Sequence, residues 1–378
     1  MKKVFYLIPT MNVGGAETMV KDYTLLMDKE QFEVKIISLD RSFHSANDYF
    51  LEEAGIPVVY LSELRYPGDK KLNFVQKVFR AIARYVDLRR IIKEEKPDIL
   101  HAHLYIGSYL KWIPLRKWGI RLFYTVHNIA EHYYDATGKN RKKYLAYKEI
   151  IRLLKKEDLT LIALHDGLKE ELCELFQTEH VITVNNGINL DRFHRELYSK
   201  SEIRNEIGIP DEKLLIGHVG RFHEQKNHKF IIRVFSELQK EKNAHLLLVG
   251  DGILKEEMEK YIQSLGLTDK ITILNNRSDI PELMCAMDVF LFPSRWEGAP
   301  LSLIEAQSMG TNCVISDRIS DSVVVNENVK VLSLDAPTEE WVDAIIHVRE
   351  TAVSEDIQKF EIRNSVLCLQ KIYQTKEE

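Results

Sequence analysis

Short apolar runs alternate with longer amphipathic stretches along the whole chain. Several runs are unbroken stretches of Val, Ile and Leu, which is typical of strands buried on both faces of a parallel sheet. The strands expected in the first part of the chain are Val4–Ile8, Val34–Leu39, Val58–Leu61, Asp98–His103, Leu122–His127, Thr160–Ala163 and Val181–Val184. The clearest helical stretches are Phe74–Glu95 and Lys142–Lys156. Strands that alternate with helices predict a parallel sheet with crossover helices.

The alternating pattern begins again after residue 187. The strands expected there are Leu214–Val219, His245–Val249, Ile271–Leu274, Val289–Phe292, Cys313–Ile315 and Val329–Leu332. The chain has 378 residues, more than the roughly 250–300 at which a single core stops growing. We therefore predict an α/β protein of two doubly wound, Rossmann-like domains that face each other across a cleft. The first would span residues 1–187 and the second 188–356, and a C-terminal helix at about 357–378 would pack back on the first domain.

Composition and charge exclude several classes of function. The net charge of −5 does not indicate a nucleic-acid partner. No apolar stretch approaches the ~20 residues of a membrane span, and the apolar run near the N-terminus is too short for a signal peptide. The four cysteines form no zinc-binding spacing. We therefore expect a cytoplasmic protein with reduced thiols.

Candidate chemistry lies in loops that follow strands, because ligands of doubly wound sheets bind beyond the carboxyl ends of the strands. Gly14 and Gly15 follow the first expected strand and precede a helix whose free N–H groups can meet a phosphate. Their spacing is not that of the dinucleotide fingerprint. A ligand-binding turn and a plain strand-to-helix turn both remain open interpretations.

A second loop, Gly220 to Asn227, follows the first expected strand of the second domain. Its Arg221 and Lys226 suit the two phosphates of a leaving nucleoside diphosphate. Such cations stabilise the charge that develops as a glycosidic bond breaks. The alternative is solvated surface charge, the commonest fate of Arg and Lys, but the position after a strand favours a functional role.

Two carboxylates eight positions apart, Glu297 and Glu305, give the strongest signal. We expect Glu297 in a loop after a strand, Gly298 and Pro300 in a tight turn, and Glu305 in the first turn of a helix capped by Ser302. Such a pair can contact two parts of one polyhydroxylated ligand, while amides of the turn meet its phosphates. The alternative for Glu305 alone is a favourable interaction with the helix dipole.

Other strand ends carry weaker signals. Gly250 relaxes the backbone after a strand, and His127 can reach a sugar hydroxyl. His101 and His103 lie on one face of a strand, but without a third ligand they are expected to be packing residues. The sequence contains no DxD motif, and therefore no obvious carboxylate pair for a metal–diphosphate complex. We expect no metal site and metal-independent activity.

Taken together, these motifs resemble family 4 retaining glycosyltransferases of the GT-B fold, and especially bacterial capsular and exopolysaccharide transferases. The matching segments are GGAE, GHVGRFHEQKNH, LLLVGDG, RSDIPELMCAMDVFLFPSRWEG and the Glu297…Glu305 pair, in the order of the family. The likeness covers about residues 3–320. It implies an acceptor-binding first domain and a second domain that binds a nucleotide-sugar donor.

The resemblance also implies roles for single residues. Arg221 and Lys226 would hold the donor diphosphate, Glu305 the ribose hydroxyls, and Glu297 the hydroxyls of the transferred sugar. His127 would contact the donor sugar and completes the expected catalytic set of Arg221, Lys226, Glu297 and His127. The remaining donor-binding positions lie at backbone turns: Gly14, Gly15, Gly220, Gly250, Arg277, Gly298, Ala299, Pro300 and Leu301.

The implied reaction moves a hexose or N-acetylhexosamine from a nucleotide diphosphate sugar, expected to be a UDP-sugar, to a saccharide or lipid-linked saccharide in capsule or exopolysaccharide synthesis. Front-side attack would retain the anomeric configuration, with the leaving phosphate taking the acceptor proton and no protein nucleophile. No cofactor is expected. The alternatives are an inactive GT-B partner subunit, another GT-B enzyme such as an epimerase or phosphorylase, and a dinucleotide-dependent oxidoreductase, which the missing fingerprint disfavours.

The stretch from Lys111 to Lys156 holds 12 basic and 3 acidic residues. It also contains Trp112, Trp118, Tyr133, Tyr134, Tyr144 and Tyr147. Basic side chains beside Trp and Tyr suit an anionic membrane surface, such as the inner face of a cell membrane. The alternative is that residues 142–156 form one solvated helix face and that the tryptophans belong to the core.

Overall fold

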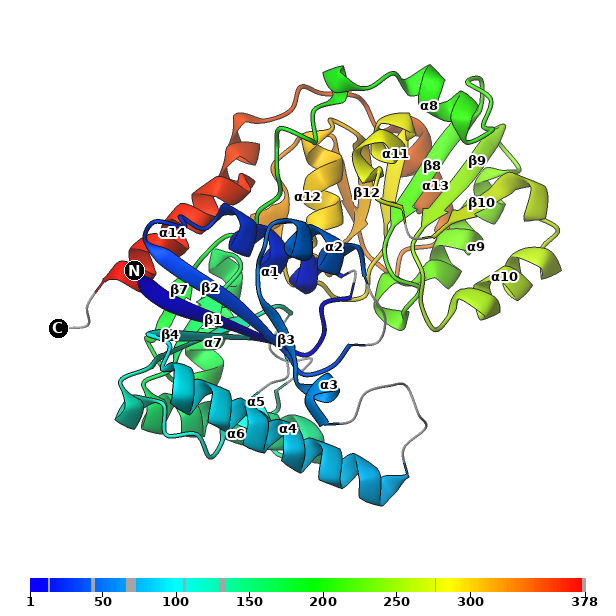
Figure 1. Ribbon diagram of the computed structural model, residues 1–378. Helices are drawn as coiled ribbons and strands as arrows, with labels where there is room; N and C mark the ends of the chain where they lie inside the picture. The colour runs from blue at the N-terminus through cyan, green and yellow to red at the C-terminus, as the bar shows by residue number, and fades with distance from the viewer. Residues whose placement is uncertain are drawn as a thin grey trace. The chain divides into compact units, whose positions relative to one another are not determined.

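Two parallel α/β units, each with its own sheet, make up the protein (Figure 1). The computed structural model describes residues 1–12, 14–41, 45–65, 73–104, 107–128, 134–275 and 277–375. The first unit comprises Met1–Asn186 together with Ile362–Glu378, and the second comprises Gly187–Glu361. The expected fold class, two doubly wound α/β domains, is confirmed by the parallel sheets and their crossover helices.

The first unit is built on a seven-stranded sheet in the order β3-β2-β1-β4-β5-β6-β7. Its strands are β1 Lys2–Ile8, β2 Phe32–Ser38, β3 Val58–Tyr60, β4 Ile99–His103, β5 Arg121–Val126, β6 Thr160–Ala163 and β7 Val181–Thr183. All neighbouring strands are parallel. Parallel strands with helices on both faces are buried throughout, and β4 and β6 are accordingly buried at every position. The carboxyl ends of the strands therefore share one edge of the sheet.

The helices of the first unit connect these strands. They are α1 Gly15–Leu26, α2 Ala46–Glu53, α3 Leu61–Arg65, α4 Phe74–Glu95, α5 Gly107–Leu110, α6 Arg141–Glu157, α7 Asp166–Phe176 and α14 Ile362–Gln374, with a 3-10 turn η1 at Arg116–Trp118. Asn73 begins α4 in a capping box with Gln76, and the Asn140 side chain accepts hydrogen bonds from the first N–H groups of α6. These side chains satisfy backbone donors that a helix start leaves free, so both helices begin where such residues stand.

The C-terminal helix is shorter than expected at its start. Residues Glu355–Phe360 form a 3-10 turn, η7, and α14 begins only at Ile362. The reason is a long-range backbone pairing: Ile188 forms a bridge with Glu361 and its N–H donates to the Phe360 carbonyl at 2.8 Å. This extended segment interrupts the helix that was expected from residue 357. Residues 376–378 of the expected helix lie outside the described part of the chain.

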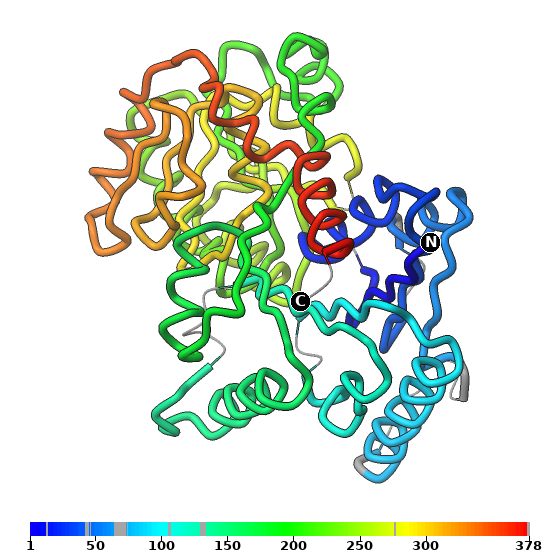
Figure 2. The backbone as a smooth tube through the Cα atoms, turned by 90° about the vertical axis from the view of Figure 1, so that its left-hand side faces the viewer, coloured from blue at the N-terminus to red at the C-terminus, as the bar shows by residue number. Residues whose placement is uncertain are grey.

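Helix α14 completes the core of the first unit from the far end of the chain. It packs against α1, and Figure 2 shows the red C-terminal helix beside the blue N-terminal segment. Tyr373 is fully buried, and its hydroxyl is hydrogen-bonded to His101 Nδ1. The Lys2 ammonium donates to the Tyr373 carbonyl at 2.7 Å. The first unit is thus assembled from two separate stretches of sequence.

The second unit is built on a six-stranded parallel sheet in the order β10-β9-β8-β11-β12-β13. Its strands are β8 Leu214–Val219, β9 Ala244–Val249, β10 Ile271–Leu274, β11 Val289–Phe292, β12 Asn312–Ser316 and β13 Val329–Leu332. Its helices are α8 Lys200–Glu206, α9 His228–Leu238, α10 Lys255–Ser264, α11 Ile280–Ala286, α12 Leu301–Ser308 and α13 Thr338–His347, and its other 3-10 turns are η3 Arg195–Leu197, η4 Glu224–Lys226, η5 Thr268–Lys270 and η6 Asp321–Val323. Trp341 of α13 is fully buried against the apolar face of α9.

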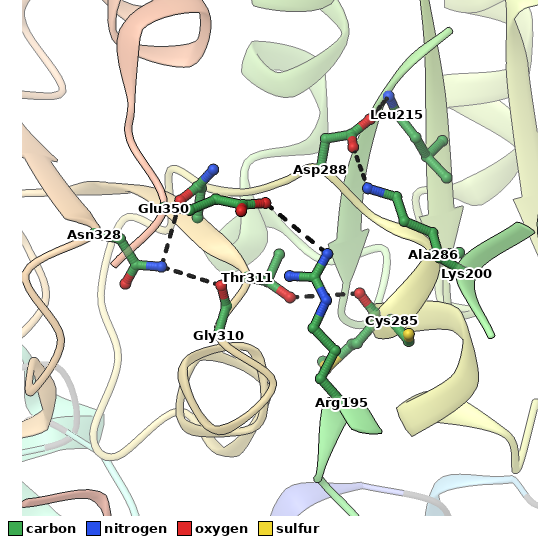
Figure 3. A network of polar contacts seen from close by, with 12 residues as sticks. Arg195, Lys200, Leu215, Cys285, Ala286, Asp288, Gly310, Thr311, Asn328 and Glu350 are labelled. Atoms are coloured by element: carbon green, nitrogen blue, oxygen red, sulfur yellow. Dashed lines mark hydrogen bonds and ion pairs between the residues drawn. The ribbon is translucent and has the colours of Figure 1, made fainter. Parts of the chain in front are cut away.

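One carboxylate fastens the start of the second unit to its sheet. Asp288, which directly precedes β11, accepts a hydrogen bond from the Leu215 backbone N–H at 2.7 Å and pairs with Lys200 of α8 (Figure 3). Arg204 of α8 lies 2.7 Å from the same carboxylate. Burial alone would raise the pKa of Asp288, but hydrogen bonds from Lys200, Leu215 and Arg204 lower it overall. The charged carboxylate therefore holds α8 against the amino ends of β8 and β11.

Candidate functional site

The candidate residues of the second unit lie at the carboxyl ends of adjacent strands. Gly220 and Arg221 follow β8, Gly250 follows β9, and the segment to Glu297 follows β11. Strand β8 lies between β9 and β11 in the sheet. Three loops that are far apart in sequence therefore meet at one edge, where ligands of doubly wound sheets bind.

Gly220 and Gly250 allow the first two of these loops to touch. Gly250 has φ +149°, and a Cβ atom there would lie 2.2 Å from the Gly220 carbonyl oxygen. The Gly220 N–H donates to the Val249 carbonyl at 2.9 Å. A Cβ at Gly220 would also come within 2.9 Å of His218 Nε2. At Gly250 a Cβ would collide with backbone, so only glycine fits there. At Gly220 a larger residue would have to displace side-chain atoms of His218 and Lys226.

Lys226 and Glu297 form an ion pair at the centre of the site. The Lys226 Nζ atom lies 2.7 Å from Glu297 Oε1, and the two side chains are only 16% and 6% exposed. Gln225 Nε2 donates to Glu297 Oε2 at 3.0 Å and to the Trp296 carbonyl at 2.8 Å. The ammonium also lies 4.6 Å from the centre of the Phe292 ring. A buried ion pair with further hydrogen bonds has a fixed geometry, so both charges are held in place before any ligand arrives.

Arg221 differs from Lys226 in being exposed. Its backbone is nevertheless anchored by the next residue, because Phe222 is fully buried and stacks on the His228 ring with centroids 4.1 Å apart. The Phe222 N–H donates to the Asp251 carbonyl at 2.9 Å. The loop thus presents a guanidinium at the strand edge from a rigid base.

The turn before α12 corrects two details of the sequence analysis. Helix α12 begins at Leu301 with Pro300 at its N-cap, and no side chain caps it. Ser302, expected to be the cap, lies inside the helix because Pro300, with φ −71°, already directs the chain into it. Glu305 consequently lies in the second turn rather than the first, where it is half-buried. Uncapped N–H groups at a helix start are free to meet an anion.

The rest of the turn is packed rather than exposed. Gly298, Ala299 and Pro300 are buried, whereas Leu301 is half-buried. Arg277 lies elsewhere, in the loop between β10 and α11, where its exposed side chain pairs with Asp279 and its Nε donates to Asp279 Oδ1 at 2.7 Å. The structure therefore joins Lys226 to Glu297 directly, and it places Arg277 in a separate ion pair.

The candidates of the first unit follow strands β1 and β5. Gly14 is the extended N-cap of α1, and a Cβ there would meet the Glu17 carboxylate at 2.4 Å. Gly15 opens the helix. His127, directly after β5, is half-buried, and its Nε2 lies 3.1 Å from Nδ1 of His103. Burial lowers the pKa of His127 to about 3, so the imidazole is neutral at physiological pH.

His127 lies beside His103, so the structure brings three imidazoles together where the sequence indicated only the pair His101 and His103. The rings of His101 and His103 lie 4.3 Å apart, and His101 also contacts Thr125 at 2.7 Å through Nε2. The three imidazoles are joined by ring contacts and hydrogen bonds. Among the described residues, no three His, Cys, Asp or Glu side chains are placed to share a metal ion.

Two neighbours of the central ion pair were not singled out from the sequence. Gln225 stands inside a quoted motif, but its bond to Glu297 depends on a contact 72 positions away. His218 is fully buried with Nδ1 2.9 Å from the Leu291 carbonyl, and burial holds its pKa well below the usual value. Because His218 stands among apolar residues of a strand, nothing in the sequence distinguishes it from a core residue.

Family models cover nearly the whole chain. Residues 13–192 match the model described as Glycosyltransferase Family 4, and residues 199–361 match Glycosyl transferases group 1. EpsF of Bacillus subtilis (strain 168) is 32% identical over 352 residues, which cover 91% of this chain and 87% of that protein. The UDP-Gal:alpha-D-GlcNAc-diphosphoundecaprenol alpha-1,3-galactosyltransferase of Escherichia coli is 28% identical, covering 96% and 90%.

A solved structure supports the fold independently. HepE of Anabaena, in complex with UDP and glucose, superimposes with a TM-score of 0.72 at 18% identity, covering 99% of this chain and 95% of that one. The identity is too low to carry an activity, but the shared architecture is that of two Rossmann-like domains. With two family models along the chain and a relative of 32% identity over most of it, the protein belongs to glycosyltransferase family 4 and is a glycosyltransferase with the GT-B fold.

Proposed function

We propose that this glycosyltransferase moves a hexose or N-acetylhexosamine from a UDP-sugar to a saccharide or lipid-linked saccharide, with retention of the anomeric configuration. The observation that carries the proposal is the buried pair of Lys226 and Glu297, 2.7 Å apart at the carboxyl end of the second sheet. It presents a cation for phosphate and a carboxylate for hydroxyl groups within one site. A nucleotide diphosphate sugar has both kinds of group.

In this proposal the cations act on the leaving group. The bond between the anomeric carbon and the β-phosphate oxygen breaks, and its electron pair stays on that oxygen. Arg221 and Lys226 stabilise the developing negative charge. Removal of one comparable contact lowers kcat by roughly 10²–10³. The acceptor hydroxyl attacks from the same face, and its proton passes to the departing phosphate. Glu297 is engaged with Lys226 and Gln225 and serves as a hydrogen-bond acceptor, not as a nucleophile.

The other candidates bind and orient the donor. Glu305 accepts hydrogen bonds from the ribose, and the loop of Arg277 receives the base. The N–H groups at the start of α12 meet a phosphate, because no side chain caps them. His127, neutral through burial, can exchange hydrogen bonds with a sugar hydroxyl without adding charge. No metal or organic cofactor takes part, so chelation with EDTA should leave turnover unchanged, and loss restored by Mg²⁺ or Mn²⁺ would contradict this.

Known proteins support the choice of donor and acceptor. The crystal structure of HepE holds UDP and glucose. The Escherichia coli relative uses UDP-Gal and a diphosphoundecaprenol-linked sugar. A UDP-sugar donor and a lipid-linked acceptor in the assembly of a surface polysaccharide are therefore the most economical proposal for this chain.

The basic stretch 111–156 supports a location on an anionic membrane. Trp112 is 61% exposed, with the Lys111 ammonium 5.1 Å and the Arg152 guanidinium 4.6 Å from its ring. It is therefore not a core residue, whereas Tyr134 is buried against Phe176. Tyr133 lies outside the described residues. Within the described part of the chain, no helix has the length and apolar character of a membrane span.

Thermal stabilisation tests the proposed donor. UDP should raise the melting temperature more than ADP or GDP do, because a bound ligand stabilises the folded state by mass action. UDP-glucose, UDP-galactose and their N-acetylated forms should then be compared for transfer, and the product anomer should be assigned by NMR. An inverted product would refute retention, and no transfer from any UDP-sugar despite UDP binding would favour the inactive partner subunit.

A further inference from the structure

Helix α4 carries an apolar stripe on its outer face. Its exposed large apolar residues are Val75 (57%), Val78 (43%), Phe79 (59%), Ile82 (53%) and Val86 (43%). They follow one another at spacings of three, one, three and four residues, which places all of them on one side of an α-helix. Single exposed apolar residues are common on protein surfaces, but a contiguous group marks a site of interaction.

The opposite face of α4 already has its partners. Leu88 and Ile92 are fully buried in the first unit. Arg80 and Arg84 each lie 2.6 Å from the Asp40 carboxylate in the loop after β2. The helix is therefore fixed on the unit by its inner face, and the stripe is left without a partner within the described residues of the chain.

Cations lie at the C-terminal end of the stripe. Arg89, Arg90 and Lys93 of α4 are exposed and stand three, four and seven positions after Val86, on the same side of the helix. Asp87, the first acidic residue of the helix, is 1% exposed and lies 3.4 Å from Arg90. The other two stand at its last positions, where Glu94 is exposed and Glu95 pairs with Lys35. An apolar stripe with a cationic margin complements an anionic lipid surface, whose acyl chains take the stripe and whose phosphates take the cations.

Helix α4 also contacts the basic stretch 111–156. The Arg89 guanidinium of α4 lies 5.6 Å from the ring of Trp118 in η1. Arg116 of η1 in turn lies 2.7 Å from Asp158, at the end of α6. Figures 1 and 2 show α4, α5 and α6 along the same side of the first unit, with α4 and α6 toward its two ends. Exposed Trp112, with its two cations, lies beside α6 in this basic stretch.

We infer that α4 lies in the interface of an anionic bilayer, with its apolar stripe buried at the boundary of headgroups and acyl chains. Amphipathic helices of this kind sink by roughly 5–10 Å. The inference rests on the proposed function, because it places the first unit where a lipid-linked acceptor is found. A second copy of the chain is the weaker occupant, since a symmetric contact would bring the cationic margins of two stripes together.

An apolar contact and a charge contact differ in their response to salt. Surface charges are screened at about 0.5 M salt, where the Debye length falls to a few ångströms, whereas apolar burial is not weakened. Wild-type protein should therefore co-sediment with vesicles of phosphatidylcholine containing about a third phosphatidylglycerol, and part of that binding should survive the high salt. Charge reversal at Arg141, Lys142 and Lys143 should remove only the salt-sensitive part.

The decisive variant is Phe79→Ser/Ile82→Ser. It should partition into the same vesicles at least about tenfold more weakly at both salt concentrations, equivalent to about 1.4 kcal/mol. The matched control is Leu26→Ser/Leu367→Ser, which changes two exposed leucines (40% and 52%) of α1 and α14 in the same unit. The control should bind as wild type does, and all proteins should keep the wild-type affinity for UDP in calorimetry.

Three outcomes overturn the inference: wild type that does not sediment, a Phe79→Ser/Ile82→Ser variant that binds vesicles like its control, and a concentration-dependent dimer that this variant abolishes in the absence of vesicle binding. The last result would identify a second copy as the occupant. Calorimetry distinguishes these outcomes from a failure of the proposed function. If wild-type protein does not bind UDP, the proposed donor is wrong, and the vesicle result is unaffected.

Discussion

Lys226 and Arg221 are both cations of the loop after β8, but Lys226 is largely buried and Arg221 is exposed. Their replacement should therefore affect stability differently. Lys226→Ala and Arg221→Ala should each lower kcat by ~10² or more, as for loss of a contact to developing charge. Lys226→Ala should in addition destabilise the protein by roughly 3–5 kcal/mol, because it leaves Glu297, 6% exposed, without its cation. Exposed Arg221 should show no such loss. Steady-state kinetics and urea unfolding of both variants test this, and near-wild-type turnover in both would disprove the assignment.

Substitution of Glu305 should affect UDP binding, whereas substitution of Glu297 should affect sugar transfer. Glu305→Gln should weaken UDP binding roughly tenfold or more, since hydrogen bonds to charged groups contribute about 1.5–3 kcal/mol. Glu297→Gln removes the negative charge beside Lys226, so it should leave UDP affinity undiminished while impairing transfer. Calorimetry with UDP and turnover with the UDP-sugar measure the two effects. Equal UDP affinity in wild type and both variants would contradict the ribose role.

Residue types and their positions after strands were enough to predict the loops of Arg221, Lys226 and Glu297. The contact between Lys226 and Glu297 was not predicted, because it joins residues 71 positions apart. It follows only from the neighbouring positions of β8 and β11 in the sheet. The error at Ser302 was local: a serine ahead of a helical pattern resembled a cap, but the preceding Pro300 had already begun the helix.

The close contact between the loops after β8 and β9 can be tested by substituting a glycine. Gly250→Ala would place a Cβ 2.2 Å from the Gly220 carbonyl, so the β8 loop must move and carry Arg221 with it. We expect both a lower melting temperature and weaker UDP binding. Gly266→Ala is the matched control, because Gly266 also has a positive φ (+66°) but nothing within 4 Å of its Cβ position.

The Gly266→Ala control should lose only about 1 kcal/mol of stability through backbone strain, with unchanged UDP affinity. If Gly250→Ala binds UDP as the control does, the two loops are not coupled in the way the packing indicates. Thermal melting and calorimetry on the two variants are sufficient for the comparison.

Strand positions were readable from the sequence because each strand is an apolar run bounded by polar loops, as at Leu214–Val219 and Ile271–Leu274. The start of α14 was not, because Glu361 is drawn out of the helix by partners far away in the chain, including the Leu190 N–H, 171 positions earlier. The exposed stripe of α4 has the same periodicity as a core-facing helix, so sequence alone does not show which side meets the protein.

Buried histidines should make the whole protein sensitive to mild acid. Burial lowers the pKa of His101 and His228 to about 3, and of His245 to about 4, below the roughly 6.5 of an unfolded histidine. As pH falls below about 6.5, the unfolded chain takes up protons first. The stability these groups contribute is therefore fully present above that pH and is lost as pH falls toward the folded-state values.

Urea unfolding at about pH 7.5 and 5.5 measures this effect in a range where carboxylates, with unfolded pKa values near 4, change little. Each such histidine should cost about 1 kcal/mol over the interval. His245→Gln should reduce the difference between the two pH values by the share of one histidine. Unfolding curves that coincide at both pH values would rule out the proposed contribution.

The placement of α14 in the first unit has a consequence for the order in which the protein is made. Residues 1–186 leave the ribosome first, yet the core they form lacks Tyr373, which is fully buried and hydrogen-bonded to His101. The second unit, Gly187–Glu361, is continuous and is complete before α14 has been synthesised. Domains generally fold as units during synthesis. Here the half of the protein that is translated first therefore acquires its final fold last, and a ribosome that stops before Ile362 releases a chain with a finished second unit and an open first one.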